Sequence, residues 1–433
     1  RLVKQAVFAN ATIGVKEMVF LDISARNDWA SSLALTGNQS YFYPAVGLTG
    51  LISNMVNLPD VISSAKVRAS YTYVGNEVPF NVVNPQHTIN AGGGINRNTQ
   101  TPFTDLKPEL ITSMEVGADV RFFTGRLGLD FTYYNITSND QFLSLPAPSG
   151  SGYTTYFVNA GEINNKGVEI TLNAIPMSSS VLQWNTSFNF ATNTNTVVEI
   201  HPDIGTISMG TSESVAIRFE AGGSMGDLWA SAFVRDAQNR IVVSDEGMPR
   251  KQTDFAYMGN VEPDWTLGWN NNLSYGKFGL SALFTGKFGG VVISQAEAML
   301  DGYGVSKRTG DARDAGSLAV DAALEDGSPV SSVDPKTWFL ATGDRNGIME
   351  YYVYDRTNIR LSQLSLSYTL SLRQDSSPVN MTFSLYGRNL FFITKKAPFD
   401  PDLVMSTDRN NQGLDNFNLP TTRTIGFNLN INF

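Results

Sequence analysis

The sequence predicts an all-β fold, an antiparallel β-barrel that spans a membrane. Apolar and polar residues alternate over segments as long as a strand, short turns alternate with long connections, and the chain ends on an alternating strand with a terminal aromatic residue. We expect about 12–14 such strands, each with one face toward lipid and one toward the lumen.

The clearest strand pair comprises residues 112–122 and 127–133, which flank a tight turn at Thr124-Gly125. The apolar face of the first segment consists of Met114, Val116, Ala118, Val120 and Phe122, and that of the second consists of Leu127, Leu129, Phe131 and Tyr133. Polar side chains occupy most of the alternate positions, as the two-residue period of a half-buried strand requires.

The same alternation returns along the whole chain. The further apolar faces are Val19, Leu21, Ile23 and Ala25; Val67, Ala69, Tyr71 and Tyr73; Val168, Ile170, Leu172 and Ala174; Leu182, Trp184, Phe188 and Phe190; Leu364, Leu366, Tyr368 and Leu370; and Val379, Met381, Phe383 and Leu385. Each segment is near the roughly ten-residue length that crosses a bilayer at a tilt.

The connections predict the orientation of the strands. Short links occur at residues 14–17, 123–126, 176–180 and 276–277, and long ones at about 76–108, 193–262, 288–355 and 389–420. In outer-membrane barrels the short turns face the periplasm and the long loops face outside. One loop contains a helix-favouring patch at residues 294–300.

Composition excludes several classes of protein. The chain has 433 residues and no cysteine, so disulfide frameworks, thiol nucleophiles and cysteine zinc sites are absent. A net charge of -9 without clustered Lys and Arg argues against nucleic-acid binding. Hydrophobic residues reach 42%. The apolar runs are nevertheless far shorter than the roughly 20 residues of a membrane helix.

The final strand carries its own signal. Its apolar face is Ile425, Phe427, Leu429, Ile431 and Phe433. An alternating last strand with a terminal aromatic residue resembles the signal that the barrel-assembly machinery recognises in outer-membrane proteins. The alternative is a soluble sandwich whose last strand ends in Phe, and the repeated barrel patterns weigh against it.

Several segments resemble one family of membrane proteins. Residues 105–109, 113–117 and 126–134 resemble a hallmark region of TonB-dependent outer-membrane receptors, especially the SusC/RagA-type group. The segments that narrow the resemblance to this group are 25–32 with 41–44 (RxDxSS…FPS), 159–169 (N-x-G-x-x-x-N-K-G-x-E), 258–264 (GN-x-x-P), and 388–391 with 400–402 (NLF…DPE, here with Asp for the usual Glu).

The resemblance implies the C-terminal part of a larger barrel of about 22 strands with a plug inside. It also implies a SusD-like lipoprotein lid as partner, energy supplied by TonB-ExbB-ExbD through an N-terminal box, and a dimer of SusC-SusD pairs. We expect the plug, the TonB box and the remaining strands to lie on an N-terminal portion that is not in this chain.

The sequence offers little catalytic chemistry, and we expect no enzyme and no catalytic residue. Residues 222–226 fit the nucleophile-elbow pattern, but that motif needs a strand-to-helix turn and a partner histidine. His87 and His201 lie in no triad context. We expect no metal or cofactor. Calcium bound by Asp301, Asp311, Asp314 and Asp344 is the alternative, without EF-hand spacing to favour it.

Aromatic residues in or beside the long loops are the candidate substrate-binding residues. They are Phe80, Trp229, Phe255, Tyr257, Trp338, Tyr351 and Tyr352. An aromatic ring can stack on a sugar face or pack against an apolar peptide side chain. Contact with a partner protein or ordinary loop packing is the alternative for each of them.

Charged residues on the polar strand faces are expected to line the lumen. They are Lys66, Arg68, Glu115, Asp119, Arg121, Glu169 and Arg388. We expect them to pair with neighbouring strands and with a plug, because a polar lumen is common to such barrels.

The function that follows from the resemblance is TonB-dependent active import of oligomeric nutrients, glycan fragments or peptides, across the outer membrane of a Gram-negative bacterium. A passive porin or a structural outer-membrane protein is the alternative, and it predicts an open lumen that conducts ions without a plug. A siderophore or cobalamin receptor is a third candidate that the motifs do not favour.

Overall fold

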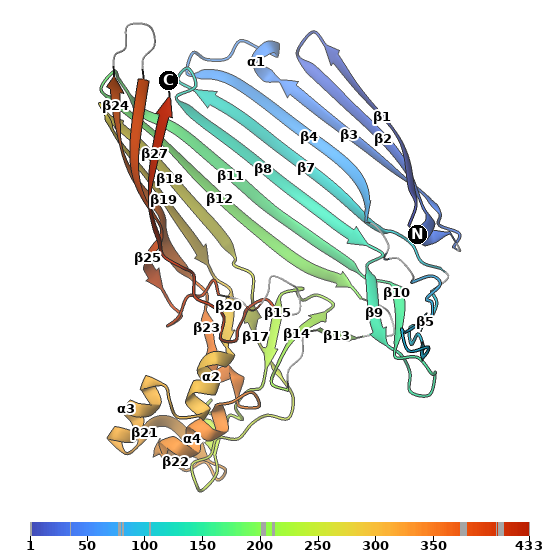
Figure 1. Cartoon of the computed structure of the whole chain (residues 1–433), viewed down its shortest axis with the longest axis vertical. Coiled ribbons are helices and arrows are strands. Elements are labelled where there is room, and N and C mark those ends of the chain that lie inside the picture. The colour runs from blue at the N-terminus through green and yellow to red at the C-terminus, as the bar shows by residue number, and fades with distance from the viewer. Residues whose placement is uncertain are drawn as a thin grey trace. The chain divides into compact units, whose positions relative to one another are not determined.

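The computed structural model describes residues 2–34, 36–76, 79, 82–103, 105–200, 205–209, 213–372, 379–403, 405 and 411–432. Within these residues the largest element is a sheet of 13 strands (Figure 1). Neighbouring strands whose residue-by-residue register is described run antiparallel. Its strands, in bonding order, are β1 (Lys4–Val15), β2 (Val19–Ala30), β3 (Ser40–Leu51), β4 (Ile62–Asn76), β7 (Glu109–Phe122), β8 (Leu127–Asn139), β11 (Glu162–Ser178), β12 (Leu182–Glu199), β18 (Trp265–Tyr275), β19 (Phe278–Phe288), β24 (Asn358–Leu372), β25 (Val379–Lys395) and β27 (Thr424–Asn432). The predicted all-β antiparallel fold is confirmed.

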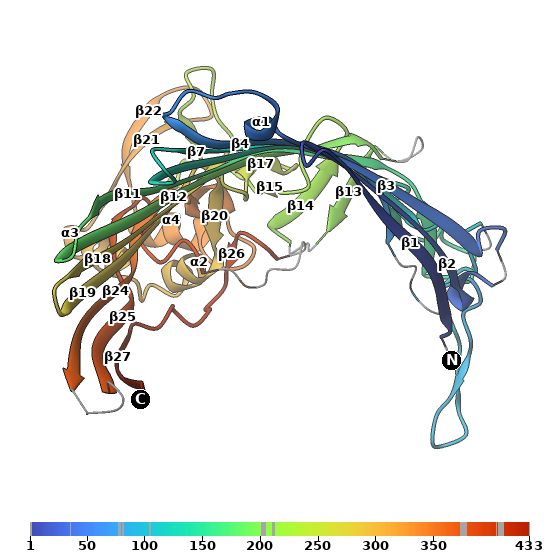
Figure 2. The ribbon, with the colours of Figure 1, turned by 90° about the horizontal axis from the view of Figure 1, so that it is seen from above.

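The chain divides into two units. The first comprises Arg1–Pro176, Ser187–Gly205 and Glu220–Gly222, and the second comprises Met177–Thr186, Thr206–Phe219 and Gly223–Phe433. In the first unit β1 to β4, β7, β8 and β11 lie side by side as long strands, and in the second unit β24, β25 and β27 are neighbours in both views (Figures 1 and 2).

The apolar strand faces are exposed. In the first unit Val116 of β7 lies opposite Ala69 of β4 and Tyr133 of β8, so apolar residues adjoin one another across the strands. Met114 and Val116 are nevertheless 48% and 41% exposed. A soluble protein would bury such a band, so this face is suited to hydrocarbon.

The opposite face is polar and internally bonded. Arg68 of β4 donates to Asp130 of β8 at 3.1 Å and to Thr132 at 2.6 Å. On β7 Asp119 accepts from Arg121 at 3.1 Å and lies 3.9 Å from the ammonium of Lys66. The prediction that lumen charges pair with neighbouring strands is confirmed for Arg68, Lys66 and Asp119, whereas Arg121 bonds within its own strand.

The predicted short turns close their hairpins. Between β7 and β8, Phe123 and Thr124 have φ of 53° and 57°, and Gly125 has φ of 81°. These left-handed conformations reverse the chain within a few residues, which suits the twist of a hairpin.

Two strands continue into segments that we expected to be loops. β12 ends at Glu199 rather than near residue 193, and β25 ends at Lys395 rather than near residue 389. In β12 the extension begins with the polar residues 193–196, and Asn195 donates to Asn165 of β11 at 2.9 Å. Inter-strand bonding between polar side chains therefore extends this strand past the end of its apolar pattern.

The connections contain smaller elements. In the first unit they are η1 (Ser31–Leu33), α1 (Ile52–Met55), β5 (Thr88–Ile89), β6 (Ile95–Asn96), β9 (Phe142–Pro146) and β10 (Thr155–Asn159). Those that fall in the second unit wholly or for the most part are β13 (Thr206–Met209), β14 (Val215–Glu220), β15 (Asp227–Ala230), β16 (Ile241–Val243), β17 (Ala256–Asn260), β20 (Val291–Ser294), α2 (Gln295–Gly302), α3 (Lys307–Ala315), β21 (Leu318–Leu324), β22 (Pro329–Val333), α4 (Pro335–Thr342), η2 (Met349–Tyr352), β23 (Val353–Asp355) and β26 (Leu414–Asp415).

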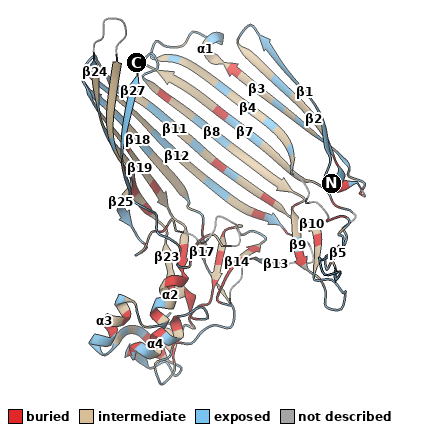
Figure 3. Ribbon diagram, viewed as in Figure 1, coloured by how far each residue is buried: buried red, intermediate tan, exposed pale blue. Residues whose placement is uncertain are grey.

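The helix predicted at residues 294–300 is confirmed as α2. Ser294 is its N-cap, and the Ser294 side chain accepts a hydrogen bond from the backbone N–H of Glu297 at 3.1 Å. Buried residues gather around α2 and the short strands of the connections, whereas the long strands are mostly intermediate or exposed (Figure 3). The best-formed hydrophobic cores thus lie in the loops.

Candidate functional site

The connections from β12 to β18 and from β19 to β24 build a folded loop module in the second unit. Its hydrophobic core contains Phe233, Val243, Ala312, Ala322, Val333, Trp338, Phe339 and Ile348. The ring of Phe233 stacks on that of Trp338 at 5.7 Å. A packed module of this kind is a rigid scaffold on which a binding site can be held.

Three candidate substrate-binding aromatics belong to the interior of this module. Trp338 is 2% exposed and Tyr352 is fully buried. Tyr351 packs against the same core, with its ring edge-on to Trp338 at 5.9 Å. We therefore leave these three residues out of the proposed site, because Trp338 and Tyr352 are buried and Tyr351 packs partly buried against the same core.

A buried polar network lies beside these tyrosines. Arg308 of α3 pairs with the fully buried carboxylate of Asp301 at 2.6 Å, and the Tyr352 hydroxyl donates to the same carboxylate at 3.1 Å. Tyr354 donates to Glu297. Burial raises the pKa of both tyrosines, and the hydrogen bond to Glu297 adds to it for Tyr354, so both hydroxyls remain donors. The network fixes α2, α3 and β23 to one another.

The remaining loop aromatics that the structure describes come together around a residue that the sequence did not single out, Arg218 of β14. Its guanidinium carbon lies 5.2 Å from the ring centre of Trp229 and 5.0 Å from that of Phe255. Tyr257 meets Trp229 edge-on at 5.7 Å and is 54% exposed. The strand register explains the grouping, because Trp229 pairs with both Ala216 and Tyr257.

A carboxylate beside Tyr257 in this arginine–aromatic cluster, that of Asp227, is already engaged. Asp227 accepts from the side chain of Asn260 at 3.1 Å and from the backbone N–H of Ser224 at 2.8 Å. Burial, with the charge of Asp227 next, raises the pKa of Tyr257. The sequence carries one signal for Arg218: it is the single charged residue among residues 215–219 of β14, whose other members are apolar and buried.

The last candidate aromatic, Phe80, lies outside the described residues, as does His201. His87 accepts a hydrogen bond from the backbone N–H of Asn98 at 2.9 Å. Residues 222–226 connect two strands, β14 and β15, rather than a strand and a helix. The context of a nucleophile elbow is therefore missing here.

The four candidate calcium ligands are dispersed within the loop module. Asp301 is bound by Arg308, Asp311 pairs with Lys307 at 2.5 Å, and Asp314 and Asp344 are exposed. Across the part of the chain that the structure describes, no three His, Asp or Glu side chains come close enough to hold a metal ion. The calcium hypothesis gains no support from this arrangement and stays a prediction.

The family-like segments of the first unit meet at the loop ends of its strands. Asn159 accepts from the backbone N–H of Lys107 at 2.8 Å, and its amide donates to the carbonyls of Lys107 and Asp140 at 2.9 Å each. Glu109 accepts from Asn76 at 2.8 Å and from the N–H of Phe142 at 2.9 Å. These contacts fasten three connections to one rim.

The family-like segments of the second unit are also joined by hydrogen bonds and an ion pair, which we call rim clamps together with those of the first unit. Arg356 donates to the carbonyl of Val261 at 2.8 Å and to that of Pro401 at 3.1 Å. Arg360 of β24 pairs with Asp400 at 2.7 Å, and both side chains are about nine-tenths buried. The GN-x-x-P and DPE-like elements therefore join one arginine-rich rim.

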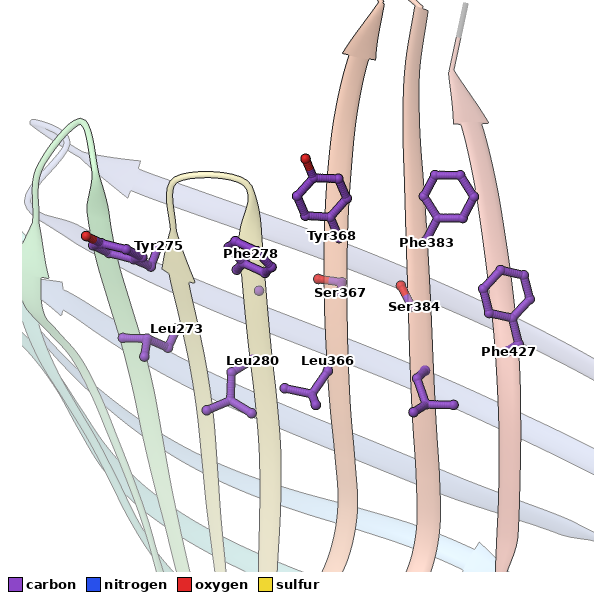
Figure 4. A pocket seen from close by; sticks show the side chains of 12 residues that line it. Leu273, Tyr275, Phe278, Leu280, Leu366, Ser367, Tyr368, Phe383, Ser384 and Phe427 are labelled. Carbon is purple, nitrogen blue, oxygen red and sulfur yellow. The ribbon is translucent and has the colours of Figure 1, made fainter.

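A hollow of about 440 Å³ opens on the apolar face of the second unit, close to the β18–β19 turn (Figure 4). Its lining includes Tyr275, Phe278, Tyr368, Phe383 and Phe427, from the five adjacent strands β18, β19, β24, β25 and β27. Phe278 and Phe427 are 63% and 64% exposed. Rings at the strand ends of an apolar face are typical of the aromatic girdle of membrane barrels, so we assign this surface to lipid contact.

Together, an exposed apolar face, a bonded polar face, short turns and large folded loops define the wall of an outer-membrane type β-barrel. None of the helices that the structure describes is long and apolar enough to span a membrane. The candidate functional sites in the loops are the arginine–aromatic cluster and the rim clamps.

Comparison with known proteins agrees with this class. Residues 3–210 match the family described as TonB dependent receptor-like, beta-barrel. The chain is 26% identical to the TonB-dependent receptor P3 of Formosa agariphila, over 99% of this chain and 45% of that protein. It is 25% identical to the TonB-dependent receptor SusC of Bacteroides thetaiotaomicron, over 36% of this chain and 17% of that protein. The chain thus spans about half the length of the first of these relatives.

A solved structure extends the match to the whole fold. The structure titled "Structure of the RagAB peptide importer in the 'open-open' state" superposes with a TM-score of 0.78 at 19% identity, over 100% of this chain and 47% of that chain. Residues 3–210 therefore match the barrel of the TonB-dependent receptors, and the predicted resemblance to the SusC/RagA-type group is confirmed.

Proposed function

We propose that the protein takes part in TonB-dependent import of oligomeric nutrients, glycan fragments or peptides, across the outer membrane of a Gram-negative bacterium. The observation that carries the proposal is the pairing of a lipid-suited outer face with a hydrogen-bonded polar face on the same strands. The similarity to SusC and to the RagAB peptide importer supports transport as the activity of this wall.

The strand order supports a barrel larger than the described sheet. Within the described residues β1 and β27 each have one partner strand. An open edge in lipid leaves backbone groups without hydrogen-bond partners, so such walls must close. We therefore propose that further strands and a plug complete the receptor and that TonB acts through the plug portion.

The loop module supports a partner on the side of the long connections. It presents a folded surface rather than flexible connections, and the RagAB similarity makes a SusD-like lipoprotein the favoured partner. Affinity purification of the receptor that carries this chain, followed by mass spectrometry, should recover that lipoprotein, and size measurement should show a dimer of pairs.

Uptake measurements test the transport proposal. Cells that express the receptor should accumulate labelled oligomers, and dissipating the proton gradient or deleting TonB should stop accumulation. Accumulation that continues without the gradient, with steady ion conductance in planar bilayers, would instead establish a passive porin.

A further inference from the structure

The arginine–aromatic cluster of Arg218, Trp229, Phe255 and Tyr257 has the chemistry of an anion receptor. A guanidinium that lies over aromatic rings is attracted to the ring faces. The guanidinium carbon of Arg218 lies over the two rings at 5.2 and 5.0 Å, and such contacts use none of its N–H groups, which remain for a further partner. The edge of a guanidinium matches the two oxygens of a carboxylate or sulfate.

The cluster is short of acceptors. Among the described residues Arg218 has no carboxylate partner, and its Nε is buried without a hydrogen bond. The indole Nε1 of Trp229 is likewise buried and without a partner. Asp227 is engaged elsewhere, because one of its oxygens accepts from Asn260 and the other from Ser224. A group that brings acceptor oxygens to the guanidinium would offset this shortage.

The same cluster exposes a stacking surface. Tyr257 is more than half exposed and is held edge-on against Trp229. An exposed ring beside a charged edge suits a sugar ring, whose faces stack while its acidic substituent projects from the rim. A bound peptide backbone would need donors and acceptors in alternation, whereas the unpartnered groups here are all donors.

We propose that Arg218 binds the carboxylate or sulfate of an acidic oligosaccharide, whose sugar ring stacks on Tyr257. This inference rests on the proposed import of an oligomeric nutrient and names its chemical class. The cluster thereby selects acidic oligosaccharides over neutral ones.

Matched pairs of sugars test the proposal by calorimetry on the detergent-solubilised receptor that carries this chain. One pair is a tetramer of α-1,4-linked galacturonate and its carboxyl-reduced counterpart, and the other is a sulfated galactan tetramer and its desulfated form. We expect at least one acidic member to bind about tenfold or more tightly than its neutral partner. Arg218→Gln should remove that difference, and Tyr257→Ala should weaken both members.

Arg250→Gln is the matched control. Arg250 belongs to the same connection, is half exposed and pairs with Glu325 at 2.8 Å, so the variant removes the same charge from a different place. Arg218→Lys retains the charge without the planar fork and should lose most of the preference. Thermal unfolding of each variant shows whether the receptor is intact, and Arg218→Lys serves if Arg218→Gln does not fold.

Three results would overturn the inference: wild-type receptor that binds no acidic sugar, acidic and neutral partners that bind equally, or Arg250→Gln that acts like Arg218→Gln. Binding of acidic tetrapeptides in place of sugars would also overturn it. TonB-dependent uptake of neutral sugars or peptides would leave the transport proposal standing, whereas loss of all energy-dependent uptake would refute that proposal separately.

Discussion

The buried ion pair between Arg360 and Asp400 is the contact that we expect to hold the loop end of β24 to the final connection. The two charged groups are 2.7 Å apart, and their side chains are 9% and 10% exposed. Arg360 also lies 4.2 Å from the ring centre of Phe392 and 3.6 Å from the carboxylate of Asp402. Asp400→Asn keeps the shape of the side chain and removes its charge.

The structure sets the size of the expected effect. Removing one partner of a buried pair costs about 3–5 kcal/mol, because the remaining charge stays in a poorly solvated place. Asp402 remains near Arg360 and lowers that cost, so we expect about 3 kcal/mol. Since each 1.4 kcal/mol is a factor of ten, local opening at the end of β24 should become about 100-fold more frequent.

Hydrogen exchange of the purified receptor measures that opening. The amides of residues 358–361 in β24 should lose about two orders of magnitude of protection in Asp400→Asn. Asp311→Asn is the control, because Asp311 and its partner Lys307 are 64% and 87% exposed and should contribute little. Protection that changes less than about threefold in Asp400→Asn, or equally in the control, would refute the reasoning.

Three further predictions concern the loop module and its attachment. Arg308→Met leaves the fully buried Asp301 without its charged partner and should cost about 3–5 kcal/mol, seen as faster proteolysis of α2. Adding Asp301→Asn should restore most of that loss. Gly290→Ala places a methyl 2.8 Å from a backbone oxygen at φ 77° and should lower the thermal midpoint more than Gly327→Ala, which has φ 87° and open space. Asp334 accepts hydrogen bonds from the first turn of α4, and these bonds lower the pKa of Asp334 below its ordinary 3.8. The hydrogen-exchange protection of α4 should therefore fall as the pH drops through that lowered pKa. In Asp334→Ala this protection should not depend on pH.

The membrane-facing half of the structure could be predicted from residue order, because lipid imposes a simple rule. Every second residue of a spanning strand must be apolar, and this rule acts within one strand without reference to its neighbours. Segments 112–122 and 127–133 therefore appear as β7 and β8 with the predicted faces. The helix α2 was predictable for a similar reason, since its cap and its helix-forming residues are local.

The loops resisted prediction because contacts distant in the chain determine them. Trp338 lies in a long connection, yet Phe233, more than 100 positions away in the chain, packs against it in a buried core. Arg218 becomes a candidate only when β14, β15 and β17 pair and bring Trp229 beside it. Neither fact follows from a spacing in the sequence.

The family-like motifs and the proposed binding residues are different residues, although the segment 258–264 begins beside Tyr257 in β17. This difference limits what the motifs can say about cargo. Asn159 and Arg356 bind backbone carbonyls at the rims, and Asp400 binds an arginine there. Such contacts are indifferent to whatever passes through the lumen, so receptors with different substrates can share them. In the proposed binding mode the choice of substrate falls instead to Arg218 and Tyr257, which take no part in those rim contacts and lie on the sheet of β14, β15 and β17. A receptor of this architecture could therefore change its cargo by replacing such residues while its motifs stay intact.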